Sequence, residues 1–189
     1  ENWTYPVNEA FRKGIFEVVS IATTTGFTTA DYASWPTFIP FLLLMSAFIG
    51  ACAGSTGGGI KIIRMLLLYK QGSREIKRLI HPNAVIPIKL GRKPVGSRVI
   101  DAVWGFLAAY VLIFAVLMLV CMALGEDPIT AYSAVGACLN NLGPGLGDAT
   151  LNYSTLSDGT KYVLSFAMLL GRLELFTLLV VLSPSFWEH

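Results

Sequence analysis

Residues 21–29 read Ile-Ala-Thr-Thr-Thr-Gly-Phe-Thr-Thr, a run of small hydroxyl-bearing residues broken by the single glycine Gly26. Consecutive threonines are poor helix formers because β-branching restricts χ1, and glycine opens backbone conformations that other residues avoid. Strongly apolar sequence lies beside this run, so an extended segment here would leave carbonyls without helical partners at membrane depth. Such backbone is tolerated in a bilayer only where it is buried in protein or lines a wet cavity. Carbonyls gathered around a wet cavity bind cations, so we interpret the segment as a pore loop.

The composition is that of a membrane protein. Hydrophobic residues make up 54% of the chain and charged residues 14%, against about 25% charged in an ordinary soluble domain. The mean hydropathy is +0.61. Residues 102–124 form 23 consecutive positions without a charge, which is long enough to span a bilayer. Together with the short apolar segments described below, this predicts an all-α membrane protein.

The basic residues are concentrated in one part of the chain. Ten of the 14 Lys and Arg residues lie between positions 61 and 98, with Glu75 as the single acid among them: Lys61, Arg64, Lys70, Arg74, Lys77, Arg78, Lys89, Arg92, Lys93 and Arg98. A short basic segment between membrane spans is retained in the cytoplasm. We therefore expect residues 61–98 and the C-terminus to be cytoplasmic, in a multi-pass membrane protein. The apolar flanks argue against a nucleic-acid partner.

The first part of the chain, residues 1–69, reads as a short helix, the pore loop and a broken helix. The short helix is expected from about Glu9 to Ala22, with Asn8 as its N-cap, and is too short to span. Apolar residues 37–49 and 60–69 are separated by the glycine-rich segment 50–59. Four glycines within six positions favour a break over a continuous helix.

Residues 70–100 are expected to be a basic cytoplasmic linker, interrupted by prolines and glycines. The last part, residues 101–189, begins with the span at 102–124. Pro128 opens a second short helix to about Leu139, because proline suits the first helical turn. An irregular segment at 140–148 follows, and then the apolar span 162–182.

These elements form an internal repeat. Gly26 and Gly143 are 117 positions apart, and Asp31 and Asp148 are separated by the same 117 positions. Each copy contains a short helix, an irregular glycine loop, an aspartate and a longer apolar segment. Self-similarity of this kind indicates one supersecondary unit used repeatedly, here around a pore axis. The first copy lacks a preceding span, so we expect at least one unit to be cut.

Four motifs in this order resemble the Trk/Ktr/HKT superfamily of bacterial potassium transporters. They are the threonine run at 23–29, Gly-Ser-Thr-Gly-Gly-Gly-Ile-Lys at 54–61, Asn-Asn-Leu-Gly-Pro-Gly at 140–145 and Gly-Arg-Leu-Glu at 171–174. The resemblance covers essentially the whole chain. It implies four helix–pore loop–helix (M1-P-M2) units around one pseudosymmetric pore, of which this chain holds the last one and a half, the other two and a half belonging to the same polypeptide. It also implies a cytosolic nucleotide-binding ring of the TrkA type as regulatory partner, and a homodimer.

The resemblance assigns roles to particular residues. Filter carbonyls are expected from Thr23, Thr24, Thr25 and Gly26 in one loop and from Asn140, Asn141, Leu142 and Gly143 in the other, with K+ held at Thr24, Thr25, Asn141 and Leu142. A gate beneath the filter is expected from Gly54, Ser55, Thr56, Gly57, Gly58, Gly59 and Arg172. We expect Asp31 and Asp148 at the outer pore mouth, where carboxylates raise the local cation concentration.

Arg172 lies about ten residues into the last apolar segment, and an intramembrane charge is a functional candidate. Pairing with Glu17 from the first short helix is the structural alternative to an electrostatic barrier at the gate.

Two other functions fit parts of the sequence. An alternating-access cation symporter also uses broken helices. The Gly-Leu-Gly-Asp sequence at 145–148 matches the GxGD pattern of intramembrane aspartyl proteases, which need a second aspartate on a neighbouring span. Asp31 is the other aspartate in a matching position. We prefer the pore to these alternatives and predict no enzyme activity.

Overall fold

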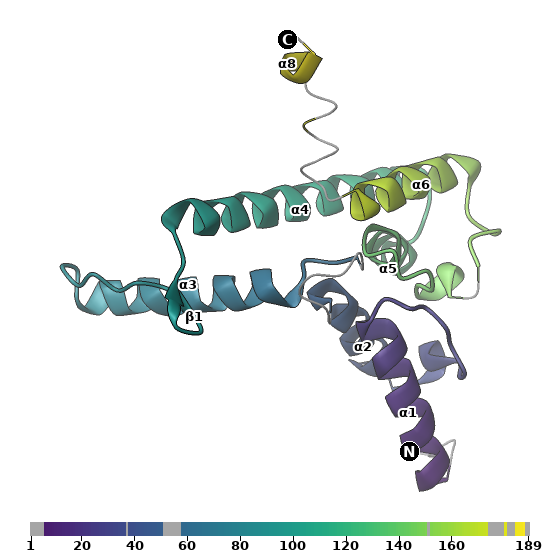
Figure 1. Cartoon of the computed structure of the whole chain (residues 1–189). Helices are drawn as coiled ribbons and strands as arrows, with labels where there is room; N and C mark the ends of the chain where they lie inside the picture. Colours follow the sequence, from purple (N-terminus) through teal and green to yellow (C-terminus); the bar gives the residue numbers. More distant parts are fainter. Residues whose placement is uncertain are drawn as a thin grey trace.

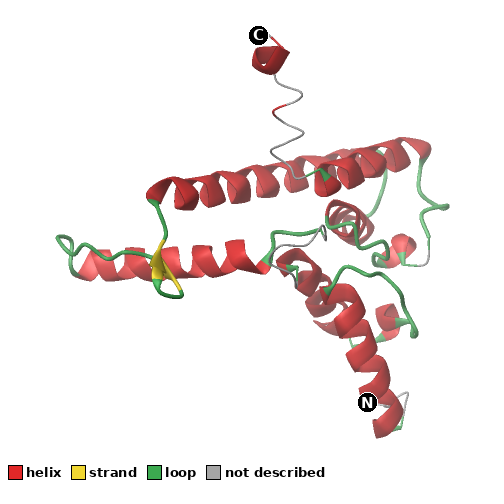
Figure 2. Cartoon of the chain, in the orientation of Figure 1, coloured by secondary structure: helices red, strands yellow, loops and turns green. Residues whose placement is uncertain are grey.

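The structure, a computed structural model, describes residues 6–36, 38–50, 58–150, 152–173, 180 and 184–187. Its main elements are helices joined by irregular loops (Figures 1 and 2). In chain order they are α1 (Val7–Ala22), the 3-10 turn η1 (Tyr32–Ser34), α2 (Phe38–Ile49), α3 (Ile62–Ile80), β1 (Lys89–Leu90), β2 (Lys93–Pro94), α4 (Ser97–Ala123), α5 (Pro128–Leu139), the 3-10 turn η2 (Gly147–Ala149), α6 (Asp158–Arg172) and α8 (Pro184–Trp187).

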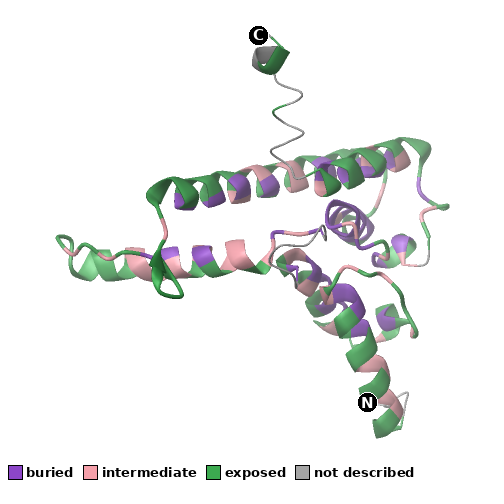
Figure 3. Ribbon diagram, in the orientation of Figure 1, coloured by how far each residue is buried: buried purple, intermediate pink, exposed green. Residues whose placement is uncertain are grey.

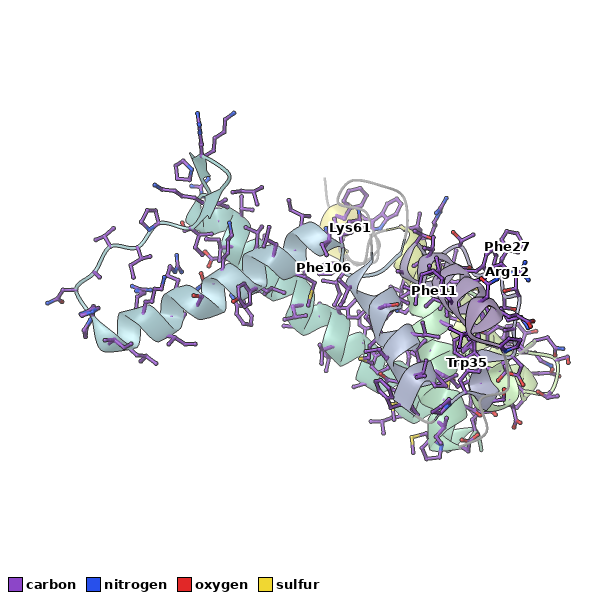
Figure 4. The ribbon with its side chains drawn as sticks, turned by 90° about the horizontal axis from the view of Figure 1, so that it is seen from below. Phe11, Arg12, Phe27, Trp35, Lys61 and Phe106 are labelled. Carbon is purple, nitrogen blue, oxygen red and sulfur yellow. The ribbon has the colours of Figure 1, made fainter. Side chains whose placement is uncertain are left out.

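The helices fall into two groups that follow the predicted repeat. In the first group, α1 packs against α2, and α3 continues away from the end of α2 (Figure 1). In the second group, α5 packs against both α4 and α6, which also contact each other. The two groups meet where α2 contacts α5 and where α3 runs beside α4. Figure 4 shows Phe27 and Trp35 at the end of the molecule that α1 forms, whereas Lys61 and Phe106 lie toward the middle.

The helix α4 is the one element, in the part of the chain that the structure describes, that is both long and apolar enough to cross a membrane. It has 27 residues and begins at Ser97, before the predicted start at residue 102. One side of α4 is buried and the other is exposed (Figure 3). The buried side carries Ile100, Val103, Phe106, Tyr110, Leu117 and Cys121.

The helix α5 is the most enclosed element. Every residue from Ser133 to Leu139 is buried, and small residues let neighbouring helices approach closely. A Cβ built on Gly136 would lie 2.9 Å from the ring of Phe48, so glycine is required where α2 crosses α5. The Phe48 ring also packs edge-on against Phe114 of α4, with 5.5 Å between ring centroids. Phe48 thereby ties α2 of the first group to the core of the second.

Several predicted boundaries differ from the structure. The first helix begins at Val7, after Pro6, so Asn8 lies inside it and the predicted Asn8 cap is wrong. The first helical bond explains this start, because the Ala10 N–H donates to the Pro6 carbonyl at 2.9 Å.

The helix α3 does not end near Tyr69 but continues through the basic segment to Ile80. Glu75 makes this possible, because its carboxylate accepts hydrogen bonds from Gln71 (2.8 Å) and Arg74 (3.1 Å) and so offsets the basic run. After α3 the strands β1 and β2 pair as a two-residue antiparallel hairpin, a small exception to the all-α expectation.

The last predicted span, 162–182, is also interrupted. The helix α6 begins earlier, at Asp158, because the Ser157 hydroxyl accepts a hydrogen bond from the Thr160 N–H at 3.2 Å. It ends at Arg172 with Leu173 as its C-cap. Gly171 in α6 therefore stands close to a helix end, as Gly50 does after α2. Residues 174–179 and 181–182 of that predicted span lie outside the described residues.

The N-cap of α5 generates a test of the fold. The Asp127 carboxylate accepts from the backbone N–H groups of Ile129 (3.0 Å) and Thr130 (3.1 Å). The Thr130 hydroxyl first, and then these backbone N–H groups, hold the pKa of Asp127 below its usual range. We expect Asp127→Ala to lower the free energy of unfolding by about 1 kcal/mol, and Asp127→Asn, which keeps the acceptor, to lower it less. Thermal unfolding of the purified full-length protein measures both.

The same cap predicts a pH dependence. A depressed carboxylate pKa contributes stability that is present above the unfolded pKa of about 3.9 and is lost as pH falls through the folded value. The difference between wild type and Asp127→Ala should therefore persist at pH 7 and narrow below about pH 4. A difference that did not change over that range would contradict a charged cap.

Candidate ion-coordinating loops

The two predicted pore loops leave their helices along the same backbone path. Three hydrogen bonds in the first loop have counterparts of matching length 117 positions later, in the second. They are Thr23 N–H to Val19 O (3.0 Å) and Asn140 N–H to Gly136 O (3.1 Å); Thr24 to Ile21 and Asn141 to Cys138 (both 3.0 Å); and Thr25 to Ser20 and Leu142 to Ala137 (both 2.8 Å). The repeat inferred from the sequence is thus a repeat of backbone geometry.

Left-handed residues recur at the same positions. Thr24 has φ 56° and Asn141 has φ 53°, while Gly26 and Gly143 have φ 81° and 106°. A β-branched residue at positive φ is uncommon and costs of order 1–3 kcal/mol. Strain of this kind persists only where the surrounding structure imposes it, and it concentrates at functional sites. Thr24 is therefore held in place by its neighbours.

This path leaves main-chain oxygens without partners. No described residue donates a hydrogen bond to the carbonyls of seven loop residues: Thr23, Thr24, Thr25, Gly26, Asn140, Asn141 and Leu142. The next carbonyls along the chain are engaged. Phe27 O accepts from the Ser20 hydroxyl at 2.6 Å, and Gly143 O accepts from the Tyr153 hydroxyl. Gly143 thus differs from the other predicted filter residues, because its carbonyl already has a donor.

The two loops lie against each other. A Cβ built on Gly26 would lie 2.0 Å from the carbonyl oxygen of Leu142 and 3.3 Å from Cδ of Pro144. Gly26 is therefore required both for its positive φ and for this close approach. Gly143 has nothing within 4 Å of such a Cβ, so its requirement is the backbone conformation alone. Residues predicted to share one site from positions 117 apart are thus brought together.

The short helices hold the outer ends of their own loops. Glu17, fully buried on α1, accepts through Oε1 from the Thr29 N–H (2.7 Å), the Thr29 hydroxyl (3.2 Å) and the Ala30 N–H (3.2 Å). These bonds do not support the alternative in which Glu17 pairs with Arg172, because the loop that follows α1 presents the donors to this carboxylate. Burying a carboxylate is costly unless it is hydrogen-bonded; the three donors satisfy Oε1, whereas Oε2 is buried with no partner among the described residues.

On α5, two hydroxyl groups bind the backbone that follows the second loop. The Ser133 hydroxyl accepts from the Leu146 N–H at 2.8 Å and donates to the Leu146 carbonyl at 3.0 Å. The Thr130 hydroxyl accepts from the Asp148 N–H at 3.2 Å. Both predicted mouth carboxylates, Asp31 and Asp148, belong to exposed residues just beyond these fastened segments.

The predicted gating segment reaches the second loop. Gly54, Ser55, Thr56 and Gly57 lie outside the described residues, but Gly58 and Gly59 are described. A Cβ on Gly58 would lie 1.7 Å from the carbonyl oxygen of Asn140, so the two backbones touch. Asn140 itself is fully buried, and its side chain accepts from the Tyr110 hydroxyl (2.8 Å) and donates to Gly136 O (2.8 Å). Asn140 therefore joins α4, α5 and the end of the gating segment.

The end of α6 also contacts this loop. A Cβ on Gly171 would lie 2.1 Å from the Leu139 carbonyl oxygen and 2.6 Å from Nδ2 of Asn141. Arg172, the next residue, is exposed in this chain and lies in the last turn of α6. The backbone of Gly171, directly before Arg172, thus contacts the same loop that Gly58 touches.

Sequence reasoning missed the tyrosines that contact the second loop. Tyr110, Tyr32 and Tyr153 donate to Asn140, Gly145 and Gly143, respectively. Tyr32 and Gly145 are 113 positions apart, and no local pattern marks such a pair. The positions of Tyr32 and Tyr153 shortly after the two loops were the available signal.

Comparison with known proteins identifies the family. The profile of the family described as "TrkH: Cation transport protein" matches residues 3–189. The chain belongs to the TrkH family. This confirms the resemblance drawn from the four motifs, and a transport family leaves no support for the aspartyl-protease alternative.

Individual members of the TrkH family are similar over almost the whole chain. The Trk system potassium uptake protein TrkH of Vibrio parahaemolyticus is 58% identical over 95% of this chain, and that of Escherichia coli K12 is 57% identical over 97%. The crystal structure of the potassium transporter TrkH from Vibrio parahaemolyticus superimposes with a TM-score of 0.90, at 56% identity, over 98% of this chain. The chain spans 37% of the two uptake proteins and 40% of the chain in the crystal structure.

The contact at Gly26 generates a second prediction. Gly26→Ala should lower the melting temperature of the full-length protein, because positive φ costs of order 1–3 kcal/mol and the new Cβ would collide with Leu142 O. Gly14→Ala is the matched control, since Gly14 lies on α1 with nothing within 4 Å of a built Cβ. It should be neutral or stabilising by up to about 1 kcal/mol. Equal melting temperatures for the two variants would contradict contact between the loops.

Proposed function

We propose that this chain is the C-terminal pore-forming part of a protein that takes up K+ through the bacterial inner membrane. The observation that carries the proposal is the set of carbonyls at residues 23–26 and 140–142 that accept no hydrogen bond from a described residue, on two repeat-related loops that touch. Carbonyl oxygens that replace the hydration shell of an ion are the means by which K+ filters select. The family and the names of the similar potassium uptake proteins agree with this ion.

In this proposal K+ is the cargo, held by backbone oxygens near Thr24, Thr25, Asn141 and Leu142. The two loops form part of a ring, which the remaining two and a half M1-P-M2 repeats of the polypeptide complete around a pseudosymmetric axis. The first loop carries threonines and the second carries Asn140 and Asn141, so the ring is imperfectly symmetric. We therefore expect weaker ion discrimination than a filter of four identical strands gives.

The short helices add an electrostatic contribution. Both α1 and α5 end directly at a loop, with Thr23 and Asn140 as their C-caps. The C-terminus of a helix carries a partial negative charge, which stabilises a cation placed there. The exposed carboxylates of Asp31 and Asp148 then serve at the external mouth, where they concentrate cations.

The gate is proposed to lie on the inner side of these loops. Gly58 rests on the Asn140 carbonyl, which is the innermost unpartnered oxygen of the second loop, and Gly171 brings Arg172 to the same place. In this arrangement the Gly54–Gly59 segment obstructs the ion path and the Arg172 charge repels cations. Opening requires both to move aside.

The drive for opening is proposed to come from the cytosol. Residues 61–98 carry ten basic residues, and Lys70 Nζ donates to the Lys89 carbonyl at 2.6 Å, which fastens the β1–β2 hairpin to α3. A TrkA-type nucleotide-binding ring docked on this cytoplasmic surface could pull on α3 and so on Gly58. We also propose that two copies of the whole protein form a homodimer.

The second candidate function is an alternating-access symporter. The separation of α2 from α3 fits a symporter as well as it fits a pore, since transporters also use discontinuous helices. Saturation of slow uptake at low external K+ would favour the symporter, whereas flux that keeps rising with concentration would favour the pore.

The direct test is ion flux through the full-length protein in liposomes, with K+ compared with Na+. We expect K+ flux to exceed Na+ flux, because the carbonyl ring is built for the larger ion. Equal fluxes of the two ions, or none with the cytosolic partner present, would contradict the proposed function.

The contact of Gly58 with Asn140 generates a gating prediction. Gly58→Ala should raise K+ flux measured without the cytosolic partner, because the new Cβ cannot fit 1.7 Å from Asn140 O and the segment must move away. Gly72→Ala on α3, where a Cβ meets nothing within 4 Å, is the control and should leave this flux unchanged. Loss of flux in Gly58→Ala alone would mean that the segment supports the loop rather than closing it.

A further inference from the structure

Two tyrosine hydroxyls hold the outer half of the second loop. The Tyr153 hydroxyl donates to the carbonyl of Gly143, and the Tyr32 hydroxyl donates to the carbonyl of Gly145 at 2.8 Å. Gly143 directly follows Asn140, Asn141 and Leu142, three consecutive residues whose carbonyls no described residue engages. The bond from Tyr153 therefore adjoins this run of free carbonyls, and the bond from Tyr32 holds the chain two residues farther on.

The two tyrosines come from different parts of the chain. Tyr32 belongs to η1 in the first helix group, is 4% exposed and packs in one apolar cluster with Leu142 and Leu146. Tyr153 lies between η2 and α6 and packs at the edge of the core around α4, α5 and α6. Because each ring is fixed by its own packing, each hydroxyl presents a donor at a defined position.

Gly143 needs such a restraint. It is exposed, has φ 106°, and nothing lies within 4 Å of the place where a Cβ would be. The next residue is Pro144, which has no N–H to anchor the peptide plane between them. Steric contact therefore does little to stop this carbonyl from rotating, and the bond from Tyr153 supplies the missing constraint.

The first loop has no equivalent pair. The positions 117 residues from Tyr32 and Tyr153 are Ala149 and Pro36, neither of which has a hydroxyl. There the Phe27 carbonyl is held instead by Ser20, from the loop's own helix. The tyrosines are thus particular to one loop and are not a requirement of the repeated fold.

Both hydroxyls remain donors at physiological pH. Burial, with a smaller contribution from Glu17, raises the pKa of Tyr32 to about 12, and burial raises the pKa of Tyr153 further. The restraint on the loop is therefore present throughout the neutral range.

We infer that Tyr32 and Tyr153 are positioning residues that set the orientation of the second loop's carbonyls and thereby the discrimination between K+ and Na+. The inference rests on the proposed function, since it deepens the role of the same loops. With Gly143 O turned toward Tyr153, the chain direction after Leu142 is fixed, and the free oxygens of Asn141 and Leu142 keep one spacing. Without the hydroxyl, the loop can shift so that its carbonyls coordinate the smaller Na+ ion. Those contacts then offset more of the free energy that Na+ loses on dehydration.

The test uses the full-length protein in liposomes, with Tyr153→Phe and Tyr32→Phe compared with wild type. Each variant removes one hydroxyl and keeps the ring. We expect the K+/Na+ flux ratio to fall about threefold to tenfold in Tyr153→Phe, the change that corresponds to one lost hydrogen bond. In Tyr32→Phe the K+/Na+ flux ratio should fall by a smaller factor, because Gly145 is farther along the chain from residues 140–142. Tyr162→Phe, whose ring is 79% exposed on α6, is the control and should match wild type.

A flux ratio does not depend on how many pores are folded, so a merely structural role for the hydroxyls would lower both fluxes and leave the ratio unchanged. An unchanged ratio in both variants, with a selective wild type, would overturn the positioning role and leave the proposed function intact. An unselective wild type would overturn the proposed function itself. If Tyr153→Phe did not assemble, the ratio of Tyr32→Phe would decide.

Discussion

A peptide carbonyl that leaves a helix inside an apolar environment must find another partner, and this requirement shapes the centre of the molecule. The hydroxyls of four residues donate to carbonyls at the ends of the two loops: Ser20 on α1, Ser133 on α5, and the two loop tyrosines. Glu17 on α1 and Thr130 on α5 instead accept from backbone N–H groups there. The oxygens left over are the ones that face no protein donor among the described residues. In the proposed function the ion is the partner of these oxygens. The protein donors thus determine which carbonyls remain available to the ion.

The two copies of the repeat share a backbone and differ in their surroundings. The hydrogen bonds at the helix ends match closely, yet α5 is enclosed by α4, α6 and α2, whereas α1 exposes Phe11, Val18 and Val19. The first loop is fastened by a carboxylate and the second by hydroxyls. In the proposed function, these different surroundings are the physical basis for an imperfectly symmetric filter.

Local sequence predicted what depends on local chemistry. The threonine–glycine run and the segment 140–148 were correctly expected to be irregular, and the offset of 117 correctly paired them, because turn residues and spacing carry that information. The pore-loop roles of individual residues remain proposals. Contacts between distant segments were not predictable: pairing with Arg172 was one alternative for Glu17, but Glu17 bonds Thr29 and Ala30, since a buried acid takes the donors that the folded chain brings to it. The same holds for Tyr32 and Gly145. The extension of α3 to Ile80 was missed because Glu75 was read as one acid in a basic run and not as the acceptor for its neighbours.

The enclosure of α5 has a consequence for biogenesis. With 12 residues, this helix is about 18 Å long and cannot cross a bilayer by itself, and its small side chains offer lipid little apolar surface. Its stable environment consists of its flanking helices and α2, which come from both ends of the chain. The helix is therefore stabilised only by neighbours that must themselves be in place. We expect α5 to take its final position late in assembly, after α2, α4 and α6 are present.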